Sequence, residues 1–208
     1  GERLRQETFR LLVAPGAVPT ASIMADCGIL GIVTGGVAYL PSLARHADNE
    51  AFAGMESDPI RRLAALAVAI PEDAERLFKR LRLSNAEHRR LASAAAGWWR
   101  IGAGMEEAAR KTLLYRIGPD AYRDRVALAF ARSGAFADNP GWRDLAGLPD
   151  RWTAPVLPVK GADLMTLGVP SGPEVGRILV QLESDWIAGD FAMDREGLLE
   201  RARGLYQA

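Results

Sequence analysis

Apolar residues recur at intervals of three and four along most of the chain, the spacing that places them on one face of an α-helix. In the first segment, Leu4, Phe9, Leu11 and Leu12 share such a face, and Pro15-Gly16 ends the helix. No run of alternating apolar and polar residues predicts a β-strand. The pattern therefore predicts an all-α, multi-helix fold.

Capping residues and helix breakers mark the helix boundaries. Asp58 followed by Pro59 indicates a helix start, and Ser84 with Glu87 has the spacing of a capping box. The same signals predict helices over residues 19–27, with Gly28 as cap and a glycine-rich loop beyond it, and over 106–117, 119–133, 162–167, 173–188 and 195–206. Residues 137–158 hold four of the twelve prolines, which separates a larger helical body from a smaller helical tail.

Residues 164–179, LMTLGVPSGPEVGRIL, place three glycines and two prolines between two apolar segments. Gly168 can end one helix in a left-handed conformation, and Gly172 precedes Pro173 at the start of the next. Gly176 has no β-carbon, so another backbone can approach closely there. The pattern resembles helix-hairpin-helix modules, which present amides at a helix N-terminus to a nucleic-acid phosphate. A tight corner whose glycines serve only packing is the alternative.

The formal net charge is zero, but the charge is unevenly distributed. Between Arg76 and Arg116, ten basic residues stand against Glu87, Glu106 and Glu107, a local surplus of seven positive charges. Such asymmetry can mark a surface that faces phosphate, and a set of solvated helix faces is the alternative interpretation.

Few residues offer catalytic chemistry. There is no P-loop, no G-x-S-x-G turn and no D-x-D pair, and two histidines with one cysteine make no zinc-ligand set. We therefore predict no catalytic and no metal-binding residues. Cys27 lies in an apolar helical stretch and is expected in the core, and a single cysteine suits the reducing cytoplasm. No apolar run approaches the roughly 18 residues of a membrane span, so no membrane partner is expected.

The segment PVKGADLMTLGVPSGPEVGRIL resembles the tail of the bacterial CCA-adding enzyme and poly(A) polymerase family, the class II tRNA nucleotidyltransferases. That family carries P-x-x-G-x-D-L-x-x-L-G-x-x-P-G-P-x-x-G-x-x-L, and Ser171 stands where proline is common. The matching positions here are Pro158, Gly161, Asp163, Leu164, Leu167, Gly168, Gly172, Pro173, Gly176 and Leu179. GERLRQETFRLL is similar to the family's E-R-I-R-x-E-L segment, and DPIRRLAALA, RLRLSNAEHRRL and LLYRIGPDAYRDRVALAFA agree with its body in the same order.

The resemblance implies that residues 1–14 are the end of a neck helix, residues 15–148 a body and residues 149–208 a tail. The family's catalytic head, with its G-G-x-V-R-D and D-x-D stretches, is not in this sequence. The chain alone is therefore expected to be inactive, and a parent enzyme is expected to use Mg²⁺ with CTP and ATP in the head. Residues 72–76, EDAER, match the letters of the family's base-selecting E-D-x-x-R motif, but they follow the E-R-I-R-x-E-L-like segment, whereas the family's motif precedes it. We therefore do not assign that role to them, and helix-dipole and side-chain pairing explain them.

The resemblance also implies that the body and tail hold tRNA, or another RNA 3′-end region, while a head adds nucleotides. Expected RNA contacts in the tail are Lys160, Gly161, Ser171, Gly172, Gly176 and Arg177. Expected contacts in the body are Arg82, Arg110, Lys111 and Arg116. Two alternatives stay open: the C-terminal region of a poly(A) polymerase, and a helical protein-interaction scaffold without RNA binding.

Overall fold

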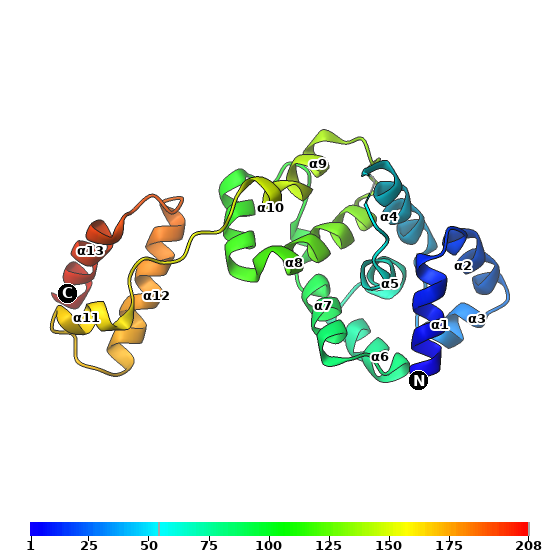
Figure 1. Ribbon diagram of the computed structural model, residues 1–208, viewed down its shortest axis with the longest axis horizontal. Coiled ribbons are helices and arrows are strands. Elements are labelled where there is room, and N and C mark those ends of the chain that lie inside the picture. Colours follow the sequence, from blue (N-terminus) through cyan, green and yellow to red (C-terminus); the bar gives the residue numbers. More distant parts are fainter. Residues whose placement is uncertain (54, 208) are drawn as a thin grey trace. The chain divides into compact units, whose positions relative to one another are not determined.

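A computed structural model describes residues 1–53 and 55–207. All regular secondary structure in these ranges is helical, and the prediction of an all-α fold is confirmed (Figure 1). The chain divides into two compact units, which we call unit 1 (Gly1–Trp152) and unit 2 (Thr153–Ala208). The neck, body and tail names stay predictions.

Unit 1 contains most of the helices. In chain order they are α1 (Glu2–Val13), α2 (Ala17–Asp26), α3 (Ile29–Thr34), α4 (Leu40–Ala53), α5 (Pro59–Ala67), α6 (Pro71–Leu81), α7 (Asn85–Ala95), the 3-10 helix η1 (Trp98–Arg100), α8 (Glu107–Ser133), α9 (Pro140–Ala146) and α10 (Leu148–Arg151). Helix α10 contacts α8 and α9, so unit 1 extends slightly beyond residue 148.

Helix α5 is the central helix of unit 1 and packs against α1, α4, α7 and α8 (Figure 1). Asp58 caps it, because its Oδ1 accepts hydrogen bonds from the backbone N–H groups of Ile60 and Arg61 at 2.8 and 2.9 Å. The helix start predicted at Asp58 and Pro59 is confirmed. Most of the helix is buried, including Leu63 and Leu66.

Two further local predictions hold at α6 and α7. Ser84 Oγ accepts from the Glu87 N–H at 3.3 Å, and Glu87 Oε2 accepts from the Ser84 N–H at 2.6 Å, so the capping box is confirmed. Asp73 accepts two backbone N–H groups ahead of α6, at 2.7 and 3.1 Å, and pairs with Arg76. The acids and arginine of residues 72–76 thus stabilise the start of α6, as the dipole interpretation expects.

The stretch after α2 differs from expectation. Residues 29–34, expected as a glycine-rich loop, form helix α3, which Gly35 ends at φ 67°. Cys27 was expected in the core, and that prediction is wrong because Cys27 is the exposed C-terminal cap of α2. The turn between α2 and α3, where Gly28 has φ 73°, buries Leu30 on one side and leaves Cys27 in solvent.

Helix α8 consists of two segments joined at a break. Gly118 has φ 77° and ψ 167°, outside helical values, and Pro119 follows it. The prediction of two helices, over residues 106–117 and 119–133, agrees with this break. The second segment carries Asp124 into the interior of unit 1.

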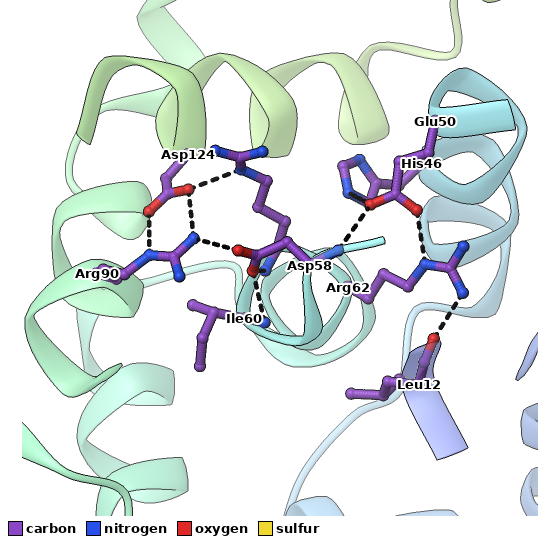
Figure 2. A network of polar contacts seen from close by, with 9 residues as sticks. Leu12, His46, Glu50, Asp58, Ile60, Arg62, Arg90 and Asp124 are labelled. Carbon is purple, nitrogen blue, oxygen red and sulfur yellow. Dashed lines mark hydrogen bonds and ion pairs between the residues drawn. The ribbon is translucent and has the colours of Figure 1, made fainter. Parts of the chain in front are cut away.

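Asp124 is a buried carboxylate surrounded by arginine donors (Figure 2). It accepts from Arg61 Nε at 2.8 Å and from Arg90 Nε and Nη2 at 2.7 and 2.8 Å. Arg90 Nη2 also lies 2.9 Å from Asp58 Oδ2, and these carboxylates raise the pKa of Arg90 above its usual value. One acidic side chain therefore joins α5, α7 and α8.

Glu50, on α4, is the second buried carboxylate of this network (Figure 2). Arg62 Nε donates to Glu50 Oε2 at 2.7 Å, and Arg62 Nη1 donates to the Leu12 carbonyl at 2.6 Å. His46 Nε2 lies 3.1 Å from Glu50 Oε1. Burial opposes ionisation of Glu50, yet His46 and Arg62 hold its pKa below its usual value. The carboxylate joins α1, α4 and α5.

Unit 2 is a three-helix unit of α11 (Gly161–Thr166), α12 (Pro173–Ala188) and α13 (Arg195–Gln207). Each helix contacts the other two. Leu164, Ile178, Leu182, Trp186 and Leu198 form its buried core. Within the described ranges of the whole chain, none of the helices has the length and apolar character that crossing a membrane requires.

Candidate nucleic-acid interface

The turn between α11 and α12 begins with a helix-ending motif. Gly168 has φ 93°, and its N–H donates to the Met165 carbonyl at 3.0 Å. The N–H of Val169 donates to the Leu164 carbonyl at 3.2 Å, and both of these side chains are buried. This is the Schellman arrangement, in which a left-handed residue satisfies the last carbonyls of a helix. The predicted role of Gly168 is confirmed.

Two other residues of the matched motif serve the packing of unit 2. A β-carbon at Gly161 would lie 3.1 Å from Val175 Cγ1, so glycine lets α11 approach α12. Asp163 accepts from the Lys160 N–H at 2.8 Å and from Arg195 Nη2 at 2.7 Å, which joins α11 to α13. These donors hold the pKa of Asp163 below its usual range. Packing and capping thus explain both positions.

The N-terminus of α12 has no side-chain cap. Gly172 is the cap residue, with φ 141° in a region that favours glycine, and Pro173 occupies the first helical position. Ser171 is exposed, and among the described residues its hydroxyl has no hydrogen-bond partner. The amides of Glu174 and Val175 therefore start a helix with no acceptor supplied by a side chain.

Gly176 lies one turn into α12 and is exposed. A β-carbon there would meet no described heavy atom within 4 Å outside the backbone of its own helix. Close packing within unit 2 therefore does not explain this glycine. The open space instead leaves room for a ligand backbone beside the first turn of α12.

Arg177 supplies positive charge to the same turn. Its guanidinium donates to both carboxylate oxygens of Glu174, at 3.1 and 2.6 Å, and to the Leu205 carbonyl at 3.2 Å. Its partnership with Glu174 lowers the pKa of the carboxyl and raises that of the guanidinium. Solvent screens exposed pairs of this kind and they contribute little to stability, so a phosphate can replace Glu174 at low cost. Lys160 is also exposed, at the start of α11.

Two glycine substitutions should change the stability of unit 2 in opposite directions. Gly168→Ala places a β-carbon at φ 93° and should destabilise the unit by about 1–2 kcal/mol. Gly176→Ala removes glycine from an exposed, sterically open helical position and should stabilise α12 by about 0.5–1 kcal/mol. Hydrogen exchange of α12 peptides in the full chain measures both changes. A loss of protection in Gly176→Ala would show that this glycine is needed for the fold.

Their contacts divide the four candidate residues of the body into two that are paired within unit 1 and two that face solvent. Arg110 is 11% exposed and donates to the Met105 and Ala103 carbonyls and to Asp144, so its guanidinium is held within unit 1. Lys111 pairs with Glu107 at 3.5 Å and is 17% exposed. Arg82 and Arg116 are exposed, and no carboxylate among the described residues pairs with either. Arg82 and Arg116 are the body candidates whose charge faces solvent.

Internal contacts also use much of the positive surplus between residues 76 and 116. Arg76 and Arg90 bind carboxylates, and Arg80 donates to the Ile32 carbonyl. Besides Arg82 and Arg116, three arginines of this range are exposed and have no carboxylate partner within the described chain: Arg80, whose guanidinium is held by the Ile32 carbonyl, Arg89 and Arg100. The surplus counted along the sequence is therefore larger than the charge available to a ligand.

The fold and the turn define an all-helical protein in which unit 2 presents an uncapped helix N-terminus beside an exposed arginine. Comparison with known proteins finds a local similarity to CCA tRNA nucleotidyltransferase 1, mitochondrial. Over 49 residues the chain is 37% identical to the proteins of Mus musculus and Homo sapiens and 43% identical to that of Danio rerio. No family model matches the chain.

Each match covers 24% of this chain and 11% of the length of the relative. The similarity supports a relation to tRNA nucleotidyltransferases, in agreement with the coarser part of the sequence prediction. The bacterial, class II assignment rests on the motifs in the sequence.

Proposed function

We propose that this chain is a tRNA-binding region of a class II tRNA nucleotidyltransferase, the body and tail that hold tRNA while a separate head adds nucleotides to the 3′ end. The observation that carries the proposal is the first turn of α12. Internal packing or capping accounts for Gly161, Asp163 and Gly168, whereas Ser171 and Gly176 have no such role within the described chain. Both lie at the uncapped helix end.

The chemistry of that helix end suits a phosphate. Unpaired N–H groups and the helix dipole favour an anion at an N-terminus, and the open side of Gly176 allows a backbone to approach. Arg177 adds a guanidinium within the same turn. Such contacts recognise the shape of the RNA backbone and carry no base specificity.

A filter-binding titration of the full chain with tRNA at several salt concentrations tests the proposal. Contacts to at least three phosphates should give a log–log slope of affinity against salt steeper than about −2. A single-stranded RNA of equal length is the comparison, because a surface that recognises tRNA shape should bind it more weakly. No tRNA binding at low salt would overturn the proposal for this chain.

Variants in unit 2 locate the contact within that experiment. Arg177→Glu should weaken tRNA binding about tenfold and reduce the salt slope by about one. Arg203→Glu is the matched control, because Arg203 pairs with Glu200 three residues earlier in the same way and lies on α13. Gly176→Ala should lower the affinity although it stabilises the helix. Equal losses in the two arginine variants would show that only net charge matters.

The poly(A) polymerase alternative involves the same surface and differs in the RNA preferred. A poly(A) oligonucleotide that binds more tightly than tRNA would favour it. In either case Mg²⁺ and ATP, with CTP for CCA addition, are proposed to act in a head outside this sequence, and a cytoplasmic location stays a prediction.

A role in protein contacts has its own supporting observation. Ile23, Ile29, Ile32 and Val37, on and around α2 and α3, have exposed fractions of 46–66%. Exposed apolar residues mark interaction surfaces in other proteins where they form a contiguous patch. Absence of tRNA binding together with self-association or capture of a protein partner would favour the scaffold alternative.

A further inference from the structure

Unit 1 contains a cavity of about 410 Å³ that is separate from the turn in unit 2. Helices α4, α8 and α9 supply most of its lining. Its volume falls in the range of roughly 300–1,000 Å³ typical of small-molecule sites. Phe52 and Arg143 line it and are exposed, so the cavity opens to solvent beside them.

Aromatic side chains form part of the lining. Phe130 and Trp142 are buried and meet edge to face, with ring centroids 5.7 Å apart. Phe52 is 54% exposed, and the Arg143 guanidinium lies 5.7 Å from the centre of its ring. A planar ring entering the cavity would find both apolar walls and an exposed aromatic face.

His46 supplies a buried polar atom to the cavity. The side chain is 1% exposed, and its Nδ1 has no hydrogen-bond partner among the described residues. Its Nε2 lies 3.1 Å from Glu50 Oε1, although not in good hydrogen-bond alignment. Nδ1 is therefore a buried polar atom that a ligand can satisfy with a hydrogen bond, and a buried polar atom without a partner is unfavourable.

The charged groups of the lining leave one cation without a carboxylate. Arg61 is bound to Asp124, and Arg123 is bound to Asp150 at 2.5 Å. Arg143 has no carboxylate partner within the described chain, and the exposed Glu56 has no basic partner there. The cavity therefore offers one guanidinium for an anionic group, the Glu56 carboxylate for an N–H donor, and the unsatisfied His46 Nδ1 for a further hydrogen bond.

We propose that this cavity binds a nucleoside monophosphate whose base carries an exocyclic amine, either as the free nucleotide or as an unstacked nucleotide of an RNA chain. The base lies among Phe52, Phe130 and Trp142, its amine donates to Glu56, another polar atom of the base forms a hydrogen bond with His46 Nδ1, and its phosphate faces Arg143. Binding of the free nucleotide does not depend on the function proposed for unit 2.

The two histidines of the chain make the test direct. His88 stacks on Phe78 at 4.5 Å and pairs with Glu75, so it lies outside the lining and is an internal reference for His46. In an NMR titration of the full chain, AMP and CMP should shift the His46 imidazole signals saturably and leave those of His88 in place. Adenosine, ribose 5-phosphate and UMP should each bind about tenfold more weakly.

An oligoadenylate of five nucleotides separates the two sources of the nucleotide. A response to AMP identifies the free nucleotide as sufficient, and a response to the oligonucleotide alone identifies a residue of RNA. No His46 shift with either probe at about 5 mM would overturn the proposal. Equal binding of L-phenylalanine, which also joins a ring, an amine and an anion, would overturn the assignment to nucleotides.

Substitutions at exposed positions test the site without disturbing the fold. Arg143→Gln and Phe52→Ala should each weaken AMP binding about tenfold, and Arg143→Gln should leave adenosine binding unchanged. Arg89→Gln, an exposed arginine outside the lining, is the matched control and should bind AMP as the native chain does. Native AMP affinity in Arg143→Gln would contradict the proposed position of the phosphate.

Discussion

The Asp124→Asn variant is expected to lose about 3 kcal/mol of unfolding free energy. The amide keeps the size of the side chain but removes the charge that three hydrogen bonds from Arg61 and Arg90 satisfy. Asp124 is only 3% exposed, so the neutral amide of the variant stays buried against the two guanidinium groups and cannot balance their charge. Removing one member of a buried ionic cluster leaves the others uncompensated, which accounts for the size of the expected loss.

Urea unfolding followed by circular dichroism measures the change. Asp120→Asn is the matched control, since Asp120 lies on the same helix and is exposed, and it should change stability by less than about 0.5 kcal/mol. The double variant Asp124→Asn with Arg90→Gln should lose less than the sum of the two single changes. Additive losses would show that Asp124 and Arg90 do not stabilise each other.

Acidification is expected to remove stability from unit 1 as the pH falls below about 4. Burial opposes ionisation of both Glu50 and Asp58, but their hydrogen bonds and arginine neighbours hold both pKa values below the usual range. A carboxyl whose pKa is lower in the folded state contributes stability that is fully present above its unfolded pKa. That contribution is lost as the pH falls through the folded pKa.

Unfolding free energies at pH 6, 4.5 and 3 test this expectation. Glu50→Gln should be less stable than the native chain at pH 6 and should lose less stability on acidification. Glu72→Gln, at an exposed position at the start of α6, should follow the native curve. If Glu50→Gln lost as much stability between pH 6 and pH 3 as the native chain, Glu50 would not be the group that titrates.

Local sequence signals predicted the parts of the fold that depend on neighbouring residues. The cap at Asp58, the capping box of Ser84 and Glu87 and the left-handed Gly168 each satisfy backbone groups within five residues. Helix α3 was not predicted because it is only six residues long and its glycine favours a loop in isolation. In the folded chain, packing against α2 and α6 stabilises the helix.

The ionic network could not be predicted from the sequence for a related reason. Asp124 and Arg61 are 63 residues apart, and only the folded arrangement of α5 and α8 brings them together. Arg90 and Arg110 likewise count as surface charge in the composition but bind carboxylates 34 residues away in the structure. At the turn, the motif located the candidate residues, and the contacts then separated Gly161, which packs, from Gly176, which does not.

The exposed position of Cys27 has a practical consequence. It is the one cysteine in the sequence, and it lies in solvent at the end of α2. A maleimide dye therefore labels unit 1 at a single defined point without mutagenesis. Energy transfer from that dye to a fluorophore on tRNA would measure where a bound RNA lies relative to α2, in the native sequence and in solution.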